Sequence, residues 1–95
     1  MKLTENFSKQ EFDCKDGTTT PEDLMDNLNK LAKNLQKIRE RIGIPIRIIS
    51  GYRSPEYNKR IGGAKRSQHI LAKAADLQVS GMSTTELANT IKQLI

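Results

Sequence analysis

One histidine and one aspartate stand close enough in the sequence to share a metal ion. His69 is the only histidine in the chain, and Asp76 follows it seven positions later. Imidazole nitrogens and carboxylate oxygens are common zinc ligands, and a catalytic zinc takes three such ligands and keeps one position for water. Water held there becomes a nucleophile near neutral pH. By themselves the two residues are a weak signal, because a lone histidine is more often an ordinary surface or core residue, and the aspartate could equally belong to a cap or a turn.

An arginine occupies a second position that is suited to chemistry. Arg53 stands between a predicted strand and Ser54, which can cap a helix, and loops at strand ends often carry functional residues. A guanidinium group there can bind a carboxylate through two parallel hydrogen bonds. The alternative is a surface arginine paired with Glu56.

Hydrophobic periodicity predicts one long helix as the main scaffold. Apolar residues recur at intervals of four, three, four, three and four, which is typical of one face of an α-helix. These residues are Leu24, Leu28, Leu31, Leu35, Ile38 and Ile42. Thr20 as the cap and Pro21 in the first turn predict where the helix begins, and Gly43 followed by Pro45 predicts where it ends.

Two short strands are predicted around the candidate chemistry. Residues 44–50 are rich in isoleucine, with alternate side chains on one face, and Gly51 follows them. Residues 74–79 form the second strand and run directly out of the segment that carries His69, before Gly81. A chain reversal between His69 and this strand could direct both candidate ligands at one ion.

Three shorter helices are predicted from their caps. Residues 8–11 and 83–86 have the form of capping boxes. The apolar pairs that could staple them are Phe7 with Phe12 and Met82 with Leu87. Ser54 and Pro55 predict a third helix, which ends near Gly62–Gly63. The apolar face of the last helix consists of Leu87, Ile91 and Leu94.

Composition limits the class of protein. The 95 residues contain no linker-like stretch and predict a single domain over residues 1–95. The single cysteine, Cys14, excludes an internal disulfide and, together with the single histidine, a structural Cys/His zinc finger. The apolar runs are too short to span a bilayer, and the first residues lack the apolar core of a signal peptide.

Taken together, the motifs resemble the zinc D-Ala-D-Ala carboxypeptidase family, and most closely its small phage and bacterial peptidoglycan-peptidase branch. The resemblance rests on Ser-Gly-Tyr-Arg-Ser at 50–54, Ser-x-His at 67–69 and Ala-x-Asp at 74–76. It extends through the motifs at 7–15, 55–59 and 61–65, and covers essentially residues 4–95. It implies an α+β fold of the Hedgehog/DD-peptidase type, in which a small antiparallel sheet packs against helices.

The resemblance also implies a role for each matching residue. His69 and Asp76 would bind Zn²⁺, Arg53 would bind the substrate or stabilise the developing oxyanion, and Ser67 would lie near the substrate. The substrate would be a peptide bond in the peptidoglycan stem peptide or crossbridge, cleaved by a D,D-carboxypeptidase or an endolysin-type endopeptidase.

The expected setting follows from the same resemblance and from charge. The net charge of +5 predicts a mostly solvated basic surface. An anionic cell-wall polymer is a better candidate partner than nucleic acid, because no nucleic-acid motif is present. We expect a monomer without membrane or nucleic-acid partners. It would be made in the cytoplasm without a signal peptide and act on the wall after release, as in a phage or prophage.

Two departures from the family pattern qualify these expectations. Ala72 replaces the glycine usually found between the histidine and the aspartate, so a positive φ there would strain the turn by about 1 kcal/mol. The family's last zinc ligand, a histidine, and its acidic general base lie on a strand after the last helix, whereas the sequence ends at Ile95. We therefore expect a domain truncated at its C-terminus, without its last strand or strands and with little or no activity.

Three alternatives stay open at this point. Cys14 could complete the zinc site, although the resemblance places it in a structural N-terminal segment. The chain could be a non-catalytic module of the same fold that binds cell-wall peptide or a partner. It could also be a small basic adaptor for nucleic acid, which would show salt-sensitive binding.

Overall fold

The periodic apolar face of the sequence forms one long helix, which packs against a two-stranded sheet. The computed structural model describes the backbone of residues 1–94 and the side chains of residues 1–92. The α-helices and strands are α1 (Met25–Ile42), β1 (Ile46–Ser50), α2 (Pro55–Arg60), β2 (Asp76–Val79) and α3 (Thr84–Leu94). Three 3₁₀ turns join them, η1 (Lys9–Phe12), η2 (Glu22–Leu24) and η3 (Gln68–Leu71). The predicted α+β class is confirmed.

The apolar face of α1 forms the centre of the core. Leu28, Leu35 and Ile38 are buried on it, and Leu28 is fully excluded from solvent. Gly43 ends the helix with a φ of 67°, and its amide donates to the Arg39 carbonyl at 3.0 Å. This left-handed residue is the glycine stop that the sequence predicts, because glycine adopts positive φ without a steric penalty.

The predicted beginning of the long helix is wrong by several residues. Thr20 does not cap it: its side chain is buried, and the hydroxyl has no hydrogen-bond partner. Pro21 is extended and precedes the turn η2, where the Leu24 amide bonds the Pro21 carbonyl at 3.0 Å, and α-helical geometry begins at Met25. Burial of Thr20 in the core took precedence over its capping preference.

The two strands pair antiparallel, with Ile46 opposite Val79 and Ile48 opposite Leu77. An irregularity between Ile48 and Ser50 brings Ser50 opposite Asp76. Both strands are two residues shorter at their beginnings than predicted. The pairing places the end of β1 beside the beginning of β2, which is where the candidate residues gather.

The N-terminal turn η1 packs against the end of β1. The Ser8 amide donates to the Glu11 carboxylate at 2.8 Å, and the rings of Phe7 and Phe12 lie 6.2 Å apart in the core. A Cβ on Gly51 would come within 2.7 Å of the Phe12 Cα. Only glycine allows this close passage, which fixes where the chain leaves β1.

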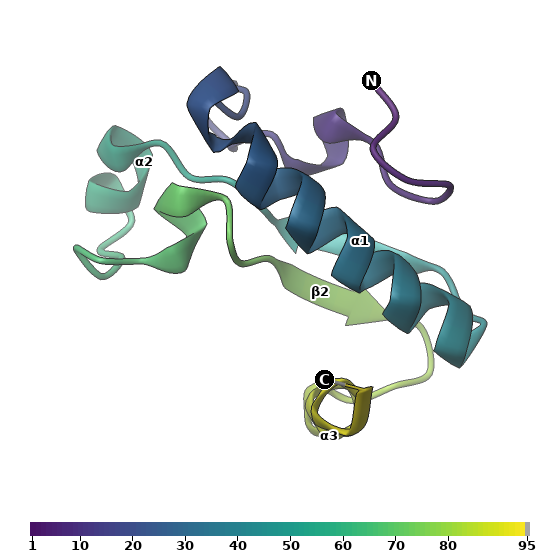
Figure 1. Ribbon diagram of the computed structural model, residues 1–95. Helices are drawn as coiled ribbons and strands as arrows, with labels where there is room; N and C mark the ends of the chain where they lie inside the picture. The colour runs from purple at the N-terminus through teal and green to yellow at the C-terminus, as the bar shows by residue number, and fades with distance from the viewer. Residues whose placement is uncertain (95) are drawn as a thin grey trace.

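Helix α3 begins as predicted at Ser83, whose hydroxyl accepts from the Glu86 amide at 3.1 Å. The Ser83 hydroxyl donates in turn to the Glu86 carboxylate at 3.3 Å. Leu87 is buried and Ile91 partly buried, whereas the side chain of Leu94 lies outside the described ones. Figure 1 shows α2 near the N-terminal end of α1 and α3 beside β2. Within residues 1–94 no helix has the length and apolarity to cross a bilayer.

Candidate metal centre

Backbone hydrogen bonds fix the position of His69 before its side chain is considered. The Ser67 hydroxyl accepts from the His69 amide at 3.2 Å and so caps η3. The Arg53 amide donates to the His69 carbonyl at 3.0 Å, which joins η3 to the residues that follow β1. Segments more than ten residues apart in the sequence therefore meet at His69.

The turn that leads from His69 to Asp76 passes through a left-handed alanine. Ala72 has φ 57° and ψ 32° and is fully buried. It is the only described residue other than glycine with a positive φ. Ala72 therefore has the positive φ that we expected to strain this turn. The conformation costs about 1 kcal/mol relative to a relaxed alanine.

The ring of His69 is held in one orientation by a carbonyl group. Its Nδ1 lies 2.8 Å from the Gly51 carbonyl oxygen. Because a carbonyl oxygen can only accept, Nδ1 must carry the proton and donate it. Neutral imidazole protonated at Nδ1 keeps a lone pair at Nε2, which is the form that binds a metal, and such a second bond is typical of metal-ligating histidines.

The second ring nitrogen of His69, Nε2, faces Asp76. His69 Nε2 lies 3.7 Å from Asp76 Oδ1, and the side chains are 12% and 58% exposed, respectively. Two ligand atoms bonded at about 2.0–2.1 Å to one tetrahedral zinc lie about 3.3–3.4 Å apart. The observed separation is within about half an ångström of that value, so the pair fits one zinc ion from the open side of Asp76.

Arg53 completes the cluster from the other side of Asp76. Its Nη2 lies 3.5 Å from Asp76 Oδ2, and its Nη1 donates to Asn58 Oδ1 at 3.4 Å. The side chain is 18% exposed, and the buried Nε has no hydrogen-bond partner. The alternative pairing with Glu56 is wrong, because the carboxylate beside Arg53 is that of Asp76.

Asn58 lies in the motif at 55–59, and its contacts in the structure show what it does. It is buried, accepts from Arg53 and donates from Nδ2 to the Ala64 carbonyl at 2.8 Å. A Cβ on Gly63 would collide with the Asn58 amide oxygen. An asparagine four residues before a Gly-Gly pair was the available signal, since such a close contact needs a residue without a side chain.

Within residues 1–92, whose side chains are described, no third metal ligand joins His69 and Asp76. Cys14 is buried elsewhere in the network that caps α2, where its sulfur accepts from the Ser54 amide at 3.4 Å.

The Ser54 hydroxyl donates to Asp16 Oδ2 at 2.7 Å, and the Thr18 amide donates to Asp16 Oδ1 at 2.9 Å. These two bonds hold the pKa of Asp16 far below its usual value.

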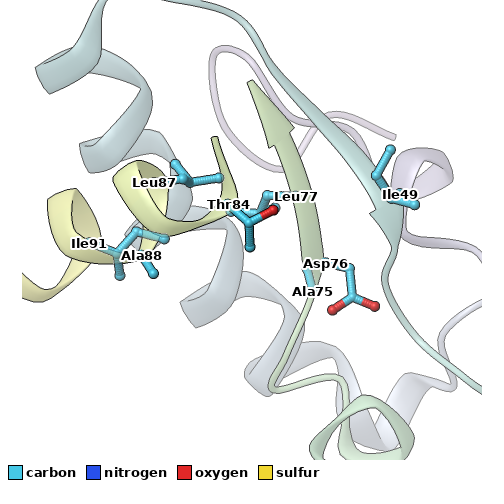
Figure 2. Close-up of a pocket in the computed structure, with 8 residues that line it drawn as sticks. All are labelled: Ile49, Ala75, Asp76, Leu77, Thr84, Leu87, Ala88 and Ile91. Atoms are coloured by element: carbon cyan, nitrogen blue, oxygen red, sulfur yellow. The ribbon is translucent and has the colours of Figure 1, made fainter. Parts of the chain in front are cut away.

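An apolar hollow of about 380 Å³ adjoins the cluster between the sheet and α3. Figure 2 shows Leu87, Ala88 and Ile91 on the helix side of it, with Asp76 and Ile49 on the strand side. The Asp76 carboxylate points away from the helix residues in this view. The ligand pair therefore lies next to a surface that can accept aliphatic groups.

Ser67 lies at the edge of the cluster. Its hydroxyl is used as the cap of η3, and it lines a second hollow with Lys65 and Arg66. The structure brings His69, Asp76 and Arg53 together and places Ser67 two residues before His69 on the same turn.

Comparison with known proteins gives one match. A family model described as peptidase M15 matches residues 3–94, nearly the whole chain. No curated protein and no solved structure matches.

Proposed function

We propose that this chain, which belongs to the peptidase M15 family of zinc-dependent peptidases of cell-wall peptides, supplies part of a zinc site. That site would hydrolyse peptide bonds of peptidoglycan. The target would be the stem peptide or crossbridge. The observation that supports this proposal is the free Nε2 of His69, 3.7 Å from Asp76 Oδ1. Action would follow release of the protein to the cell wall.

His69 and Asp76 would hold the metal. The Gly51 carbonyl fixes the imidazole, and Arg53 lies beside the second oxygen of Asp76, so both ligands are oriented before the ion arrives. Bound zinc supplies an activated water nucleophile and polarises the carbonyl group of the peptide bond. A catalytic zinc takes a third protein ligand, which we place outside the described residues.

Arg53 would bind the substrate or stabilise the developing oxyanion. The two terminal nitrogens of its guanidinium group contact Asp76 and Asn58, respectively. These contacts restrict the rotation of the group. Fixed donors aimed at developing negative charge stabilise a transition state more than mobile donors do. Its remaining N–H groups are the donors that a peptide carbonyl or a terminal carboxylate would use, and we expect Ser67 to contact the same substrate.

Zinc binding by this chain tests the ligand assignment. Titration of zinc into ¹⁵N-labelled protein should shift the imidazole Nε2 signal of His69, with weak affinity because only two ligands are present. His69→Ala and Asp76→Ala should abolish the binding. Asp26→Ala, which removes an exposed carboxylate on α1, is the matched control and should leave it unchanged. Zinc binding that survives His69→Ala would contradict the assignment.

Hydrolysis is tested on a protein in which a third ligand is supplied. The chain would be joined to the last strand of a family member. Release of free amines from purified peptidoglycan should then require zinc, stop with chelator and be lost in His69→Ala. A folded, zinc-loaded protein that leaves peptidoglycan intact would contradict the proposal. The length of the fragments released separates carboxypeptidase from endopeptidase action.

A further inference from the structure

A run of cations follows Arg53 in the chain, and the candidate metal centre does not use them. They are Lys59, Arg60, Lys65 and Arg66, and all four are exposed. Among the described side chains, the arginine–carboxylate pair is that of Arg53 with Asp76. The Arg60 guanidinium lies 5.9 Å from the centre of the Tyr57 ring. The charge of the other three is free for a ligand.

Two hollows lie among these cations and adjoin one another. The first holds about 400 Å³ and is lined by Pro55, Asn58, Lys59, Gly63, Lys65 and Ile70. The second holds about 380 Å³ and is lined by Lys65, Arg66, Ser67, Gln68, Ile70 and Leu71. Lys65 and Ile70 line both hollows, so the two lie on either side of these side chains, and we call the pair the basic trough. Hollows of roughly 300–1,000 Å³ are typical of small-ligand sites.

The basic trough is connected to the candidate metal centre through two residues. Asn58 lines its first hollow and also accepts a hydrogen bond from Arg53. Ser67 lines its second hollow and caps the turn that carries His69. The trough therefore shares Asn58 with the anchor of Arg53 and Ser67 with the cap of the His69 turn.

We propose that the basic trough is a binding subsite for carboxylate-bearing residues of a peptide, adjoining the position where the peptide bond is cleaved. This inference rests on the proposed function, which makes a wall peptide the substrate. Lys59, Lys65 and Arg66 supply the positive charge. Ile70, Pro55 and Leu71 supply apolar walls for aliphatic side chains, which a peptide has and a phosphodiester polymer lacks.

Binding of two matched peptides tests the subsite without any metal. The probes are acetyl-alanyl-glutamyl-alanine amide and its glutaminyl twin, which differ by a single charge. Chemical shifts of ¹⁵N amides should move at residues 58–71 with the glutamyl peptide. At low salt the protein should bind the glutamyl peptide about fivefold or more tightly than the glutaminyl peptide. At high salt the affinity for the glutamyl peptide should fall towards that for the glutaminyl peptide.

Charge reversal locates the effect on the protein. Lys65→Glu with Arg66→Glu should weaken the glutamyl peptide by about tenfold or more, since attraction becomes repulsion at both positions. Lys33→Glu with Lys37→Glu changes charge equally on the exposed side of α1 and should change affinity less than about twofold. Equal losses in the two double variants would overturn the subsite and leave only a general charge effect.

A third arm separates the peptide from other anions. A single-stranded oligonucleotide and a glycerol-phosphate oligomer should bind no more tightly than the glutamyl peptide. Tighter binding of either one, lost in the Lys65→Glu, Arg66→Glu protein, would assign the trough to a polyanion and overturn the peptide proposal. Because no arm contains zinc, failure here is distinguishable from failure of the metal site, which the His69 titration reports.

Discussion

Helix α1 and the segment 67–76 are held in place by different forces. Five of the 18 residues of α1 are buried, so packing fixes the helix. In the segment 67–76 only Ala72 is buried. Hydrogen bonds position this segment instead: the Ser67 hydroxyl and the Gln68 carbonyl accept from amides within it, and the Arg53 amide donates to it. Stability therefore comes from one region and chemistry from the other. Segments with few buried apolar contacts open locally at lower free energy.

Truncating a core residue of α1 should give the largest effect. Leu28→Ala removes a fully buried side chain and should lower the free energy of unfolding by about 3 kcal/mol, since it leaves a cavity as well as losing burial. Urea unfolding at neutral pH measures this. The surviving folded fraction should keep its zinc affinity. A loss of zinc affinity in fully folded Leu28→Ala would show that the two regions are not independent.

Removing a candidate ligand should give the opposite pattern. His69→Ala should abolish measurable zinc binding, because it removes one of the two ligands that the described residues supply. The free energy of unfolding without metal should change by less than about 1 kcal/mol, because η3 contains no buried residue. Parallel calorimetry and urea unfolding provide the comparison. Unfolding of the apo-protein on this change would make His69 a structural residue.

Arg53 should follow the pattern of the site segment. Arg53→Ala loses an ion pair with a carboxylate that is 58% exposed, and such pairs contribute up to about 1 kcal/mol. Thermal unfolding should shift little, whereas turnover in a zinc-loaded protein with a third ligand should fall by orders of magnitude. Arg53→Lys keeps the positive charge but loses the planar arrangement of donors in the guanidinium group, so it is the matched control for geometry. Retained turnover with a large loss of stability would reverse the assignment.

Asp16 offers a smaller, pH-dependent test outside both regions, at the cap of α2. Its pKa is lowered mainly by the Ser54 hydroxyl, so its contribution is present above the ordinary carboxyl value and is lost as pH falls below it. Asp16→Asn should be less stable than the parent at pH 7, and the gap should narrow below about pH 4. Glu5→Gln, which removes an exposed carboxylate, should show a smaller gap. A gap that widens in acid would contradict the stated direction.

Ala72→Gly should have the smallest effect. Glycine relieves about 1 kcal/mol of left-handed strain, but the change also removes a buried methyl group and loosens the unfolded chain. These terms nearly cancel, so the free energy of unfolding should stay within about 0.5 kcal/mol of the parent. Ala64→Gly, in an exposed loop without positive φ, should only destabilise. Stabilisation by Ala72→Gly well beyond 1 kcal/mol would mean that the methyl group contributes nothing.

The sequence predicted the elements that depend on local rules. Periodicity predicted α1, and Gly43 followed by Pro45 predicted its end. Ser8, Ser54 and Ser83 predicted the helices that they cap. The turn η3, which Ser67 caps, was not predicted, because its residues were expected to form a loop. The beginning of α1 was wrong because burial of Thr20 is a tertiary effect. The positive φ at Ala72 was predicted only as a condition, because the motif places glycine there.

The candidate site was predicted by residue and not by contact. Spacing and resemblance selected His69, Asp76 and Arg53, and the structure brings them together. Their orientation depends on the Gly51 carbonyl and on Asn58, and a backbone carbonyl leaves no signature in the sequence. Identification of the partners that orient a ligand required the fold.

Asp76 has one oxygen facing His69 and the other facing Arg53. Residues that share a partner have non-additive substitution energies, with coupling on the order of 0.5–3 kcal/mol. Once Asp76 is lost, subsequent loss of His69 or Arg53 costs far less than it would have cost first. The order of substitutions therefore matters in evolution: a lineage that gives up the aspartate releases selection on both neighbours at once, whereas one that gives up either neighbour still has reason to keep the aspartate.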